Sequence, residues 1–412
     1  MSAPTAPHAG HAHPIKIWRF ALIIALLSTL APFSIDTYLP SFPDITGALH
    51  ANALQMQQTL SIYLIAFGVM MLAHGPLSDA CGRKPVIVGA LLAYIATSIG
   101  CALAQTIEWL IVMRAGQGLA AGAGLVIGRA MIRDVYAGAP AQRLMSNVTM
   151  TFAIAPAIAP IIGGWLHEWW GWRSVFWFLA LISSGILYLA WAHLPETLPP
   201  AGRQPVHLRP VLRAYVQVVR NRRFMRLVAL LSLNFAGMFL YIASVPALLF
   251  DVLHFAPGEF GWFFVPVVSG IMLGAFLSGR VAGRLAPHQT INLGYALLGG
   301  AALLNVLQAV LLAPNSITVV MPIMLYATGM SLAAPSLTLL ALDEYPQRRG
   351  LAAAVQGSAQ TLSNALIAGV LSPLLSAQVL SLALGMLGLL ALSYLLWRWE
   401  IPLIMKSPQD QA

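Results

Sequence analysis

The chain has very few charged residues. Only 8% of its 412 residues are Asp, Glu, Lys or Arg, about a third of the share in an average soluble domain, while 59% are hydrophobic. So little polar surface cannot cover a chain of this length in water. Apolar runs of about twenty residues, the length of a membrane-crossing helix, recur from end to end. The composition therefore excludes an ordinary soluble protein and predicts an all-α integral membrane protein.

Cysteines and catalytic motifs are also scarce. The 2 cysteines, Cys81 and Cys101, lie at opposite ends of one predicted helix. They are about 30 Å apart by helical rise, so they cannot form a disulfide with each other. The chain has no phosphate-binding loop, zinc-binding His-Glu-x-x-His or nucleophile elbow. We therefore expect no enzyme activity, no cofactor and no metal site.

The basic residues indicate how the chain is oriented. The net charge is +9, but Lys and Arg are scattered between apolar runs and do not form the dense face of a nucleic-acid-binding protein. With the N-terminus in the cytoplasm, all but three of the 22 Lys and Arg residues lie on the cytoplasmic side. The exceptions are Arg173 outside and Arg114 and Arg129 within helices. The positive-inside rule therefore predicts cytoplasmic termini and an even number of helices.

Hydropathy predicts twelve transmembrane helices in two halves of six. The first six are expected near 17–40, 54–76, 84–104, 107–132, 144–167 and 173–194, and the second six near 225–250, 259–282, 290–312, 316–341, 350–373 and 377–398. The chain then divides into a disordered cytoplasmic tail (1–16), a first half (17–194), a cytoplasmic linker with an amphipathic helix (195–224), a second half (225–398) and a cytoplasmic tail (399–412). Histidines in the first tail leave metal binding as the alternative there.

The turn between the second and third helices carries a charged motif. Its residues are Gly75, Asp79, Gly82, Arg83 and Lys84. The glycines permit a tight turn, Asp79 can accept hydrogen bonds from the first amides of a neighbouring helix, and Arg83 can pair with a carboxylate. This segment resembles the loop signature of the major facilitator superfamily. A related segment near Arg280 and Arg284 in the second half indicates internal duplication. It lacks the acid, so we expect this second charged motif, or latch, to hold its helices together more weakly than the first.

The fourth helix contains a second motif of that superfamily. Arg114, Gln117 and Gly118 match its R-x-x-Q-G pattern. A membrane-embedded arginine costs several kcal/mol unless it is paired or hydrated. The alternative is that Arg114 extends to the outer interface.

The fifth helix resembles the motif of the superfamily's antiporter branches. Pro156, Pro160, Gly163 and Gly164 bend the helix and let a neighbour approach closely, although alanines replace two upstream glycines. The resemblance implies export. An ordinary helix kink without bearing on direction is the alternative.

The first helix carries Asp36, the carboxylate that we place in the apolar part of the first half. Desolvation and the nearby Arg114 charge pull its proton affinity in opposite directions, so it can exchange a proton or hold a cationic substrate. A hydrated interfacial aspartate is the alternative. Three segments, which are Ser34 to Pro43, the helix 4 end from Gly128 to Asp134 and the helix 5 prolines, together resemble the bicyclomycin and chloramphenicol resistance branch of drug:proton antiporters. That resemblance implies proton coupling and substrate binding at Asp36 and Arg114.

Further polar residues are candidates for substrate binding. Helix 7 offers Asn234 and Tyr241, and helix 11 offers Gln356 and Gln360 at four-residue spacing. These residues can line a wet cavity or hydrogen-bond neighbouring helices. An apolar chamber with few polar anchors would be completed by three more residues, Phe33, Tyr38 and Met150.

These features together predict a major facilitator fold with a transport function. The leading hypothesis is a proton-coupled exporter of small amphiphilic or apolar drugs that works by alternating access and confers antibiotic resistance. We expect a monomer in the lipid bilayer of a bacterial inner membrane, with drugs and protons as its partners and no nucleic acid. The alternative is a major facilitator symporter or uniporter for a small metabolite or nutrient.

Overall fold

The structure is a computed structural model that describes residues 17–204 and 207–405. The described residues form helices and their connections, with one isolated β-bridge between Ala282 and Leu285. This confirms the all-α prediction. The predicted tail 1–16 and the last part of the predicted tail 399–412 lie outside the described residues.

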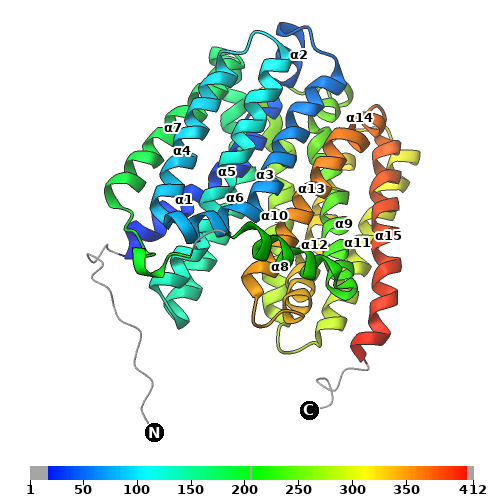
Figure 1. Ribbon diagram of the computed structural model, residues 1–412. Helices are drawn as coiled ribbons and strands as arrows, with labels where there is room; N and C mark the ends of the chain where they lie inside the picture. The colour runs from blue at the N-terminus through cyan, green and yellow to red at the C-terminus, as the bar shows by residue number, and fades with distance from the viewer. Residues whose placement is uncertain (1–16, 205–206, 406–412) are drawn as a thin grey trace.

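The first half of the chain folds into long helices joined by short connections (Figure 1). Asn52 and Thr106 cap two of them by accepting hydrogen bonds from amides in the first helical turn. The helices are α1 (Ile17–Asp36), the short α2 (Phe42–Ala48), α3 (Ala53–Cys81), α4 (Arg83–Ala102), α5 (Ile107–Val135), α6 (Gly138–Trp170) and α7 (Arg173–His193).

The second half repeats this pattern after a linker helix. Asn221 and Asn315 cap two of its helices in the same way. The helices are the linker helix α8 (Leu208–Arg220), then α9 (Arg222–Pro246), α10 (Gly261–Val281), α11 (Pro287–Leu311), α12 (Ser316–Asp343), α13 (Arg349–Leu366), the short α14 (Ser372–Leu375) and α15 (Val379–Met405).

Eleven helices of the described chain are long and apolar enough to cross a membrane. The predicted count of twelve is reached only with α13, which carries Gln356, Gln360 and Asn364 and continues into a π-helical turn at Ile367–Leu371. This polar helix packs against α3 and α9 inside the bundle. Its polarity is tolerated because other helices shield it from lipid.

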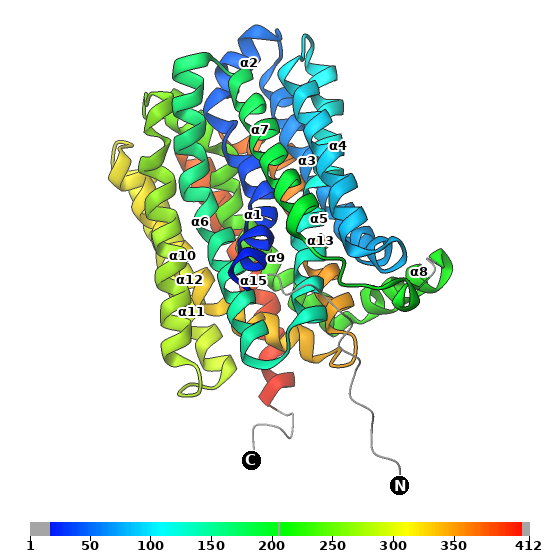
Figure 2. The ribbon, with the colours of Figure 1, turned by 90° about the vertical axis from the view of Figure 1, so that its left-hand side faces the viewer.

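The two halves meet along two pairs of helices. Helix α3 of the first half packs against α13, and α6 packs against α10. The linker helix α8 runs across the direction of the long helices (Figure 1 and Figure 2). It is tied to the first half by the Tyr215 hydroxyl, which donates to the Leu72 carbonyl of α3 at 2.8 Å. Residues 195–204 and α8 thus connect two similar bundles.

Several predicted boundaries were wrong. Helix α1 ends at Asp36, so Tyr38 lies in the turn that leads to α2. Helix α3 continues to Cys81, which places Gly75 and Asp79 within a helix and leaves only Gly82 as the turn. Helix α15 continues beyond residue 398 into the predicted tail. Hydropathy marks the apolar stretch of a helix, whereas its first and last residues also depend on the local backbone and on the partners of the terminal amides and carbonyls.

Glycines let the helices of the first half approach closely. A Cβ atom on Gly118 of α5 would collide with the Tyr63 carbonyl of α3, and one on Gly124 would lie 2.6 Å from the Leu27 carbonyl of α1. Small residues at such crossings are the usual means of packing helices in lipid, where no hydrophobic effect drives their association. Gly118 therefore sets the distance between α3 and α5.

We expect Gly118→Ala to lower the free energy of unfolding by about 1–3 kcal/mol, the usual cost of overpacking a close contact. Thermal denaturation of the purified protein in detergent measures this loss. Gly89→Ala in α4 is the matched control, because a Cβ there meets no atom within 4 Å. Equal midpoints for the two variants would show that the close approach at Gly118 is not needed.

Candidate functional site

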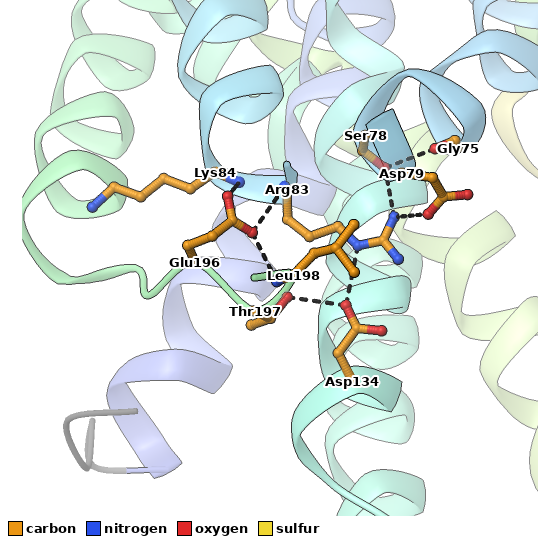
Figure 3. Close-up of polar contacts among 9 residues, drawn as sticks. All are labelled: Gly75, Ser78, Asp79, Arg83, Lys84, Asp134, Glu196, Thr197 and Leu198. Atoms are coloured by element: carbon orange, nitrogen blue, oxygen red, sulfur yellow. Dashed lines mark hydrogen bonds and ion pairs between the residues drawn. The ribbon is translucent and has the colours of Figure 1, made fainter. Parts of the chain in front are cut away.

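Arg83, the first residue of α4, lies at the centre of a charged cluster (Figure 3). Its Nη1 atom lies 2.5 Å from Asp79 Oδ1 of α3, and its Nε atom lies 3.0 Å from Asp134 Oδ2 of α5. The same Nη1 donates to Ser78 Oγ at 2.7 Å. The Arg83 side chain is mostly buried, so its paired carboxylates offset the cost of desolvating the charge. Three helix ends are thereby joined at one point.

Glu196, which follows α7, binds the start of α4. Its carboxylate accepts hydrogen bonds from the Arg83 amide at 3.0 Å and the Lys84 amide at 3.2 Å. Amides in the first helical turn have no partner within the helix, and the helix dipole favours an anion there. The predicted contact of Asp79 with these amides was wrong. Asp79 instead pairs with the Arg83 side chain.

Gly82 is the residue that makes this arrangement fit. Its φ angle is +97°, and a Cβ atom would lie 2.6 Å from Glu196 Oε2. Both the backbone conformation and the space therefore require glycine. Within the described residues the Lys84 side chain forms no ion pair, and Figure 3 shows it pointing away from the cluster.

Two members of this cluster, Asp134 and Glu196, were not predicted from the sequence as partners of Arg83. Each is an acid at the end of a helix, on the side of the bundle where basic residues dominate. An acid placed against that excess of positive charge was the available signal.

A corresponding charged cluster in the second half contains arginines from a different helix. Glu400 of α15 is fully buried and pairs with Arg226 of α9, while Arg223 lies 3.1 Å from Glu344 at the end of α12. Arg280 and Arg284, the predicted echo of the first motif, form no ion pair in the described chain. The second latch therefore keeps acids at the ends of the equivalent helices and takes its arginines from α9.

Arg114 of α5 lies fully buried inside the first half. Its Cζ atom lies 4.3 Å from the ring centre of Tyr38 and 4.4 Å from that of Tyr63. Aromatic faces attract a guanidinium in this geometry, more strongly when water is excluded. The burial excludes the alternative in which Arg114 extends to the outer interface.

The polar contacts of Arg114 satisfy only part of its guanidinium. The Nη1 atom donates to the Ser34 carbonyl at 3.0 Å and to Gln117 Oε1 at 2.8 Å. Gln117 in turn donates to Ser98 Oγ at 2.8 Å. The Nε and Nη2 atoms are buried without a hydrogen-bond partner. Arg114 thus keeps free donors inside the bundle.

Asp36, the last residue of α1, is also buried, with 4% of its surface exposed. This excludes the alternative of a hydrated interfacial aspartate. The described residues show no salt bridge between Asp36 and Arg114, although the Ser34 carbonyl that binds Arg114 lies two residues before Asp36. The backbone of α1 therefore connects the two predicted coupling residues, whose side chains form no ion pair in the described part of the chain.

The glycines of α6 connect this site to the second half. A Cβ on Gly163 would collide with the carbonyl of Thr37, the residue after Asp36, and one on Gly164 would collide with the Pro257 carbonyl. One turn further along α6, Glu168 Oε1 accepts from the Gly258 amide at 2.8 Å. Pro156 and Pro160 lie within the continuous helix α6. This end of α6 therefore closes against the second half.

The predicted substrate-binding residues occupy several places. Asn234, Gln356 and Gln360 line one cavity of about 110 Å³ in the second half. Tyr241 does not line it, because its buried hydroxyl accepts from Asn305 Nδ2 at 2.6 Å. Phe33 and Met150 lie outside this cavity, and 56% of the Met150 side chain is exposed. The structure thus joins three of the predicted residues and gives Tyr241 the alternative role of linking helices.

Comparison with known proteins identifies this arrangement. The profile of the Major Facilitator Superfamily matches residues 24–368. The chain belongs to the Major Facilitator Superfamily. It is a multi-pass membrane transporter of this superfamily.

The similarity of the chain to individual superfamily members indicates the branch to which it is related. The chain is 30% identical to the uncharacterized MFS-type transporter YdgK of Bacillus subtilis, covering 86% of this chain and 87% of that protein. It is 28% identical to the bicyclomycin resistance protein homolog of Haemophilus influenzae, covering 68% and 70%. It is 30% identical to the chloramphenicol resistance protein of Pseudomonas aeruginosa, covering 70% of each. The predicted resemblance to the bicyclomycin and chloramphenicol resistance branch is confirmed.

Superfamily members of known structure share the fold. The human organic anion transporter MFSD10 superimposes with a TM-score of 0.67 at 17% identity, covering 93% of this chain and 99% of that one. This confirms the predicted major facilitator fold.

We expect Arg83→Gln to destabilise the protein by about 1–3 kcal/mol, because it removes charge-assisted hydrogen bonds to two carboxylates and leaves those acids unpaired. Thermal denaturation in detergent measures the change. Lys84→Gln is the control, since it removes the adjacent positive charge from a side chain outside the cluster. A smaller loss of stability for Arg83→Gln than for Lys84→Gln would contradict the role of Arg83 in holding the helix ends together.

Proposed function

We propose that this transporter is a proton-coupled exporter of small amphiphilic or apolar compounds, including antibiotics. The observation that carries the proposal is the burial of Asp36 and Arg114, which are connected through the Ser34 carbonyl of α1 and form no ion pair among the described residues. A charged carboxylate is costly inside a membrane protein unless it is paired. Proton binding to Asp36 removes that cost without a paired cation.

The free hydrogen-bond donors of Arg114 can stabilise Asp36 in its deprotonated state. When Asp36 releases its proton, the unpartnered Nε and Nη2 atoms of Arg114 can bind the new carboxylate. Such a move shifts the end of α1 relative to α5. Tyr38 and Tyr63 hold the guanidinium in place by their ring faces in both states. Proton loading and release thereby select between two packings of the first half.

The end of α6 transmits this change to the contact between the halves. Thr37, next to Asp36, rests on Gly163, and the adjacent Gly164 rests on Pro257 of the second half. A shift of the chain at Asp36 would therefore move α6 at Gly163, one residue from the contact of Gly164 with Pro257 that seals the two halves against each other. The motif that resembles the antiporter branches is the part that makes these contacts, which favours exchange of proton and drug over symport.

The cavity of the second half supports an apolar cargo. Its wall contains Phe235, Met330 and Leu337 beside the amides of Gln356 and Gln360. A largely apolar wall with a few polar anchors has the composition of a site for amphiphilic molecules, and at about 110 Å³ the cavity must widen in another state of the transport cycle to hold one. The resistance relatives support the assignment to antibiotics. The basic loops support cytoplasmic termini in a bacterial inner membrane, and we propose that the transporter works as a monomer.

We expect Asp36→Asn to abolish proton-coupled drug efflux, because asparagine keeps the size of the side chain but does not exchange a proton. The measurement uses inside-out membrane vesicles with an acidified lumen and a pH-sensitive dye. Drug addition raises the lumen pH in an antiporter, because protons leave as drug enters. Asp251→Asn, which removes an exposed acid from the other half, serves as the control and keeps this response.

Two results would contradict the proposal. Undiminished lumen alkalinisation by Asp36→Asn would remove Asp36 from the coupling. Drug-dependent proton movement in the same direction as the drug would replace the exporter with a symporter.

A further inference from the structure

A groove of about 520 Å³ lies between α11 and α15, on the outside of the second half. These two helices pack side by side at one edge of the molecule (Figure 1). The volume is in the range of about 300–1,000 Å³ that is usual for sites that bind organic molecules. Its lining does not include Gln356 or Gln360, so it is separate from the cavity of the second half.

The groove has an apolar end formed by missing side chains. A Cβ atom on Gly299 or Gly300 would meet no atom within 4 Å, so the two glycines leave open space on the surface of α11. Leu303, Leu387 and Leu390 form the walls around them. In a bilayer this space faces hydrocarbon, and a hydrocarbon chain is the partner that its walls favour.

The other end of the groove is polar and basic. Asn292, Tyr394 and Arg398 line it, about two turns along the helices from the glycines. Arg398 is exposed and forms no ion pair among the residues that the structure describes. Asn292 is held in place by Trp397, whose Nε1 donates to Asn292 Oδ1 at 2.7 Å. A fixed polar rim with an unneutralised cation is a site for an anion.

We propose that this groove binds one anionic phospholipid of the cytoplasmic leaflet. Its phosphate lies against Arg398 and Tyr394, and one acyl chain lies over Gly299 and Gly300. The order of the groove matches that of a lipid, since the basic end lies toward the end of α15 and the apolar end toward the middle of the bundle (Figure 1). The assignment of this lipid to the cytoplasmic leaflet depends on the proposed orientation, in which both termini are cytoplasmic.

A second copy of the chain fits this groove less well. Two copies related by a two-fold axis along the membrane normal present the same surface to each other at the same depth. Their Arg398 side chains would face each other, and like charges repel strongly where water is scarce. A negatively charged headgroup neutralises Arg398 instead.

The test measures lipid retention by native mass spectrometry of the full chain in neutral detergent, with phosphatidylglycerol or phosphatidylcholine added. We expect one phosphatidylglycerol per chain and weaker retention of phosphatidylcholine. Arg398→Gln should weaken phosphatidylglycerol binding about tenfold, the effect of losing one charge-assisted contact of about 1.4 kcal/mol. Gly300→Leu should also release the lipid, because the added side chain fills the space for the acyl chain.

Matched controls separate this site from general charge effects. Arg284→Gln removes an exposed arginine that does not line the groove and should keep the lipid. Arg398→Lys should restore most of the binding. Glycerol phosphate, which has the headgroup chemistry without acyl chains, should not compete at equal concentration.

Three outcomes would overturn the inference: equal retention of the two lipids, unchanged phosphatidylglycerol binding in both Arg398→Gln and Gly300→Leu, or a lipid-free dimer that Arg398→Gln strengthens. The binding measurement uses no proton gradient and no drug. Asp36→Asn should retain the lipid fully, so failure of the proposed transport cycle and failure of this site are distinguishable.

Discussion

The burial of one positive charge organises the first half of this transporter. Arg114 has no exposed surface, and a bare guanidinium at that depth is costly. The protein offsets the cost with two tyrosine rings, the Ser34 carbonyl and the Gln117 side chain. These groups come from the turn after α1, from α3, from α1 and from α5. The geometry requires all three helices to pack tightly, which Gly118 permits by letting α5 touch the backbone of α3.

The charged clusters at the ends of the two halves show what the internal duplication preserves. In the first half, Asp134 in the last turn of α5 binds the Arg83 side chain of α4, and Glu196 after α7 binds the Arg83 amide. In the second half, Glu344 and Glu400 occupy the ends of α12 and α15, the equivalent helices, but bind arginines of α9. The shared element is thus a pair of acids that gathers helix ends, and the arginines that bind them come from different helices in the two halves. A motif search that follows the arginines finds the first cluster and misses the second.

Much of the fold was predictable because lipid imposes a simple rule on apolar length. The helix ends were not, since α3 continues to Cys81 and α1 stops at Asp36, and neither position coincides with the end of the apolar stretch. Single residues with a strong physical cost, such as Arg114 and Gly82, could be selected from the sequence. Partners such as Glu196 could not be assigned, because its contact with the α4 amides depends on how the end of α7 folds back. The role of Tyr241 could not be decided from the sequence, because a polar group in a membrane helix serves equally to line a cavity or, as here, to hydrogen-bond a neighbouring helix at Asn305.

The position of the α6 glycines supplies the physical link that the proposed exchange of proton and drug requires. A seal that opens independently of proton binding would let drug or protons leak, whereas a seal tied to Asp36 opens only with a change in its charge. Gly163 touches the residue beside Asp36, and its neighbour Gly164 touches the other half. Any side chain at either position would separate α6 from one of these partners. The close contacts at both glycines thus place α6 between the residue beside Asp36 and the second half, which is the connection that the proposed coupling requires.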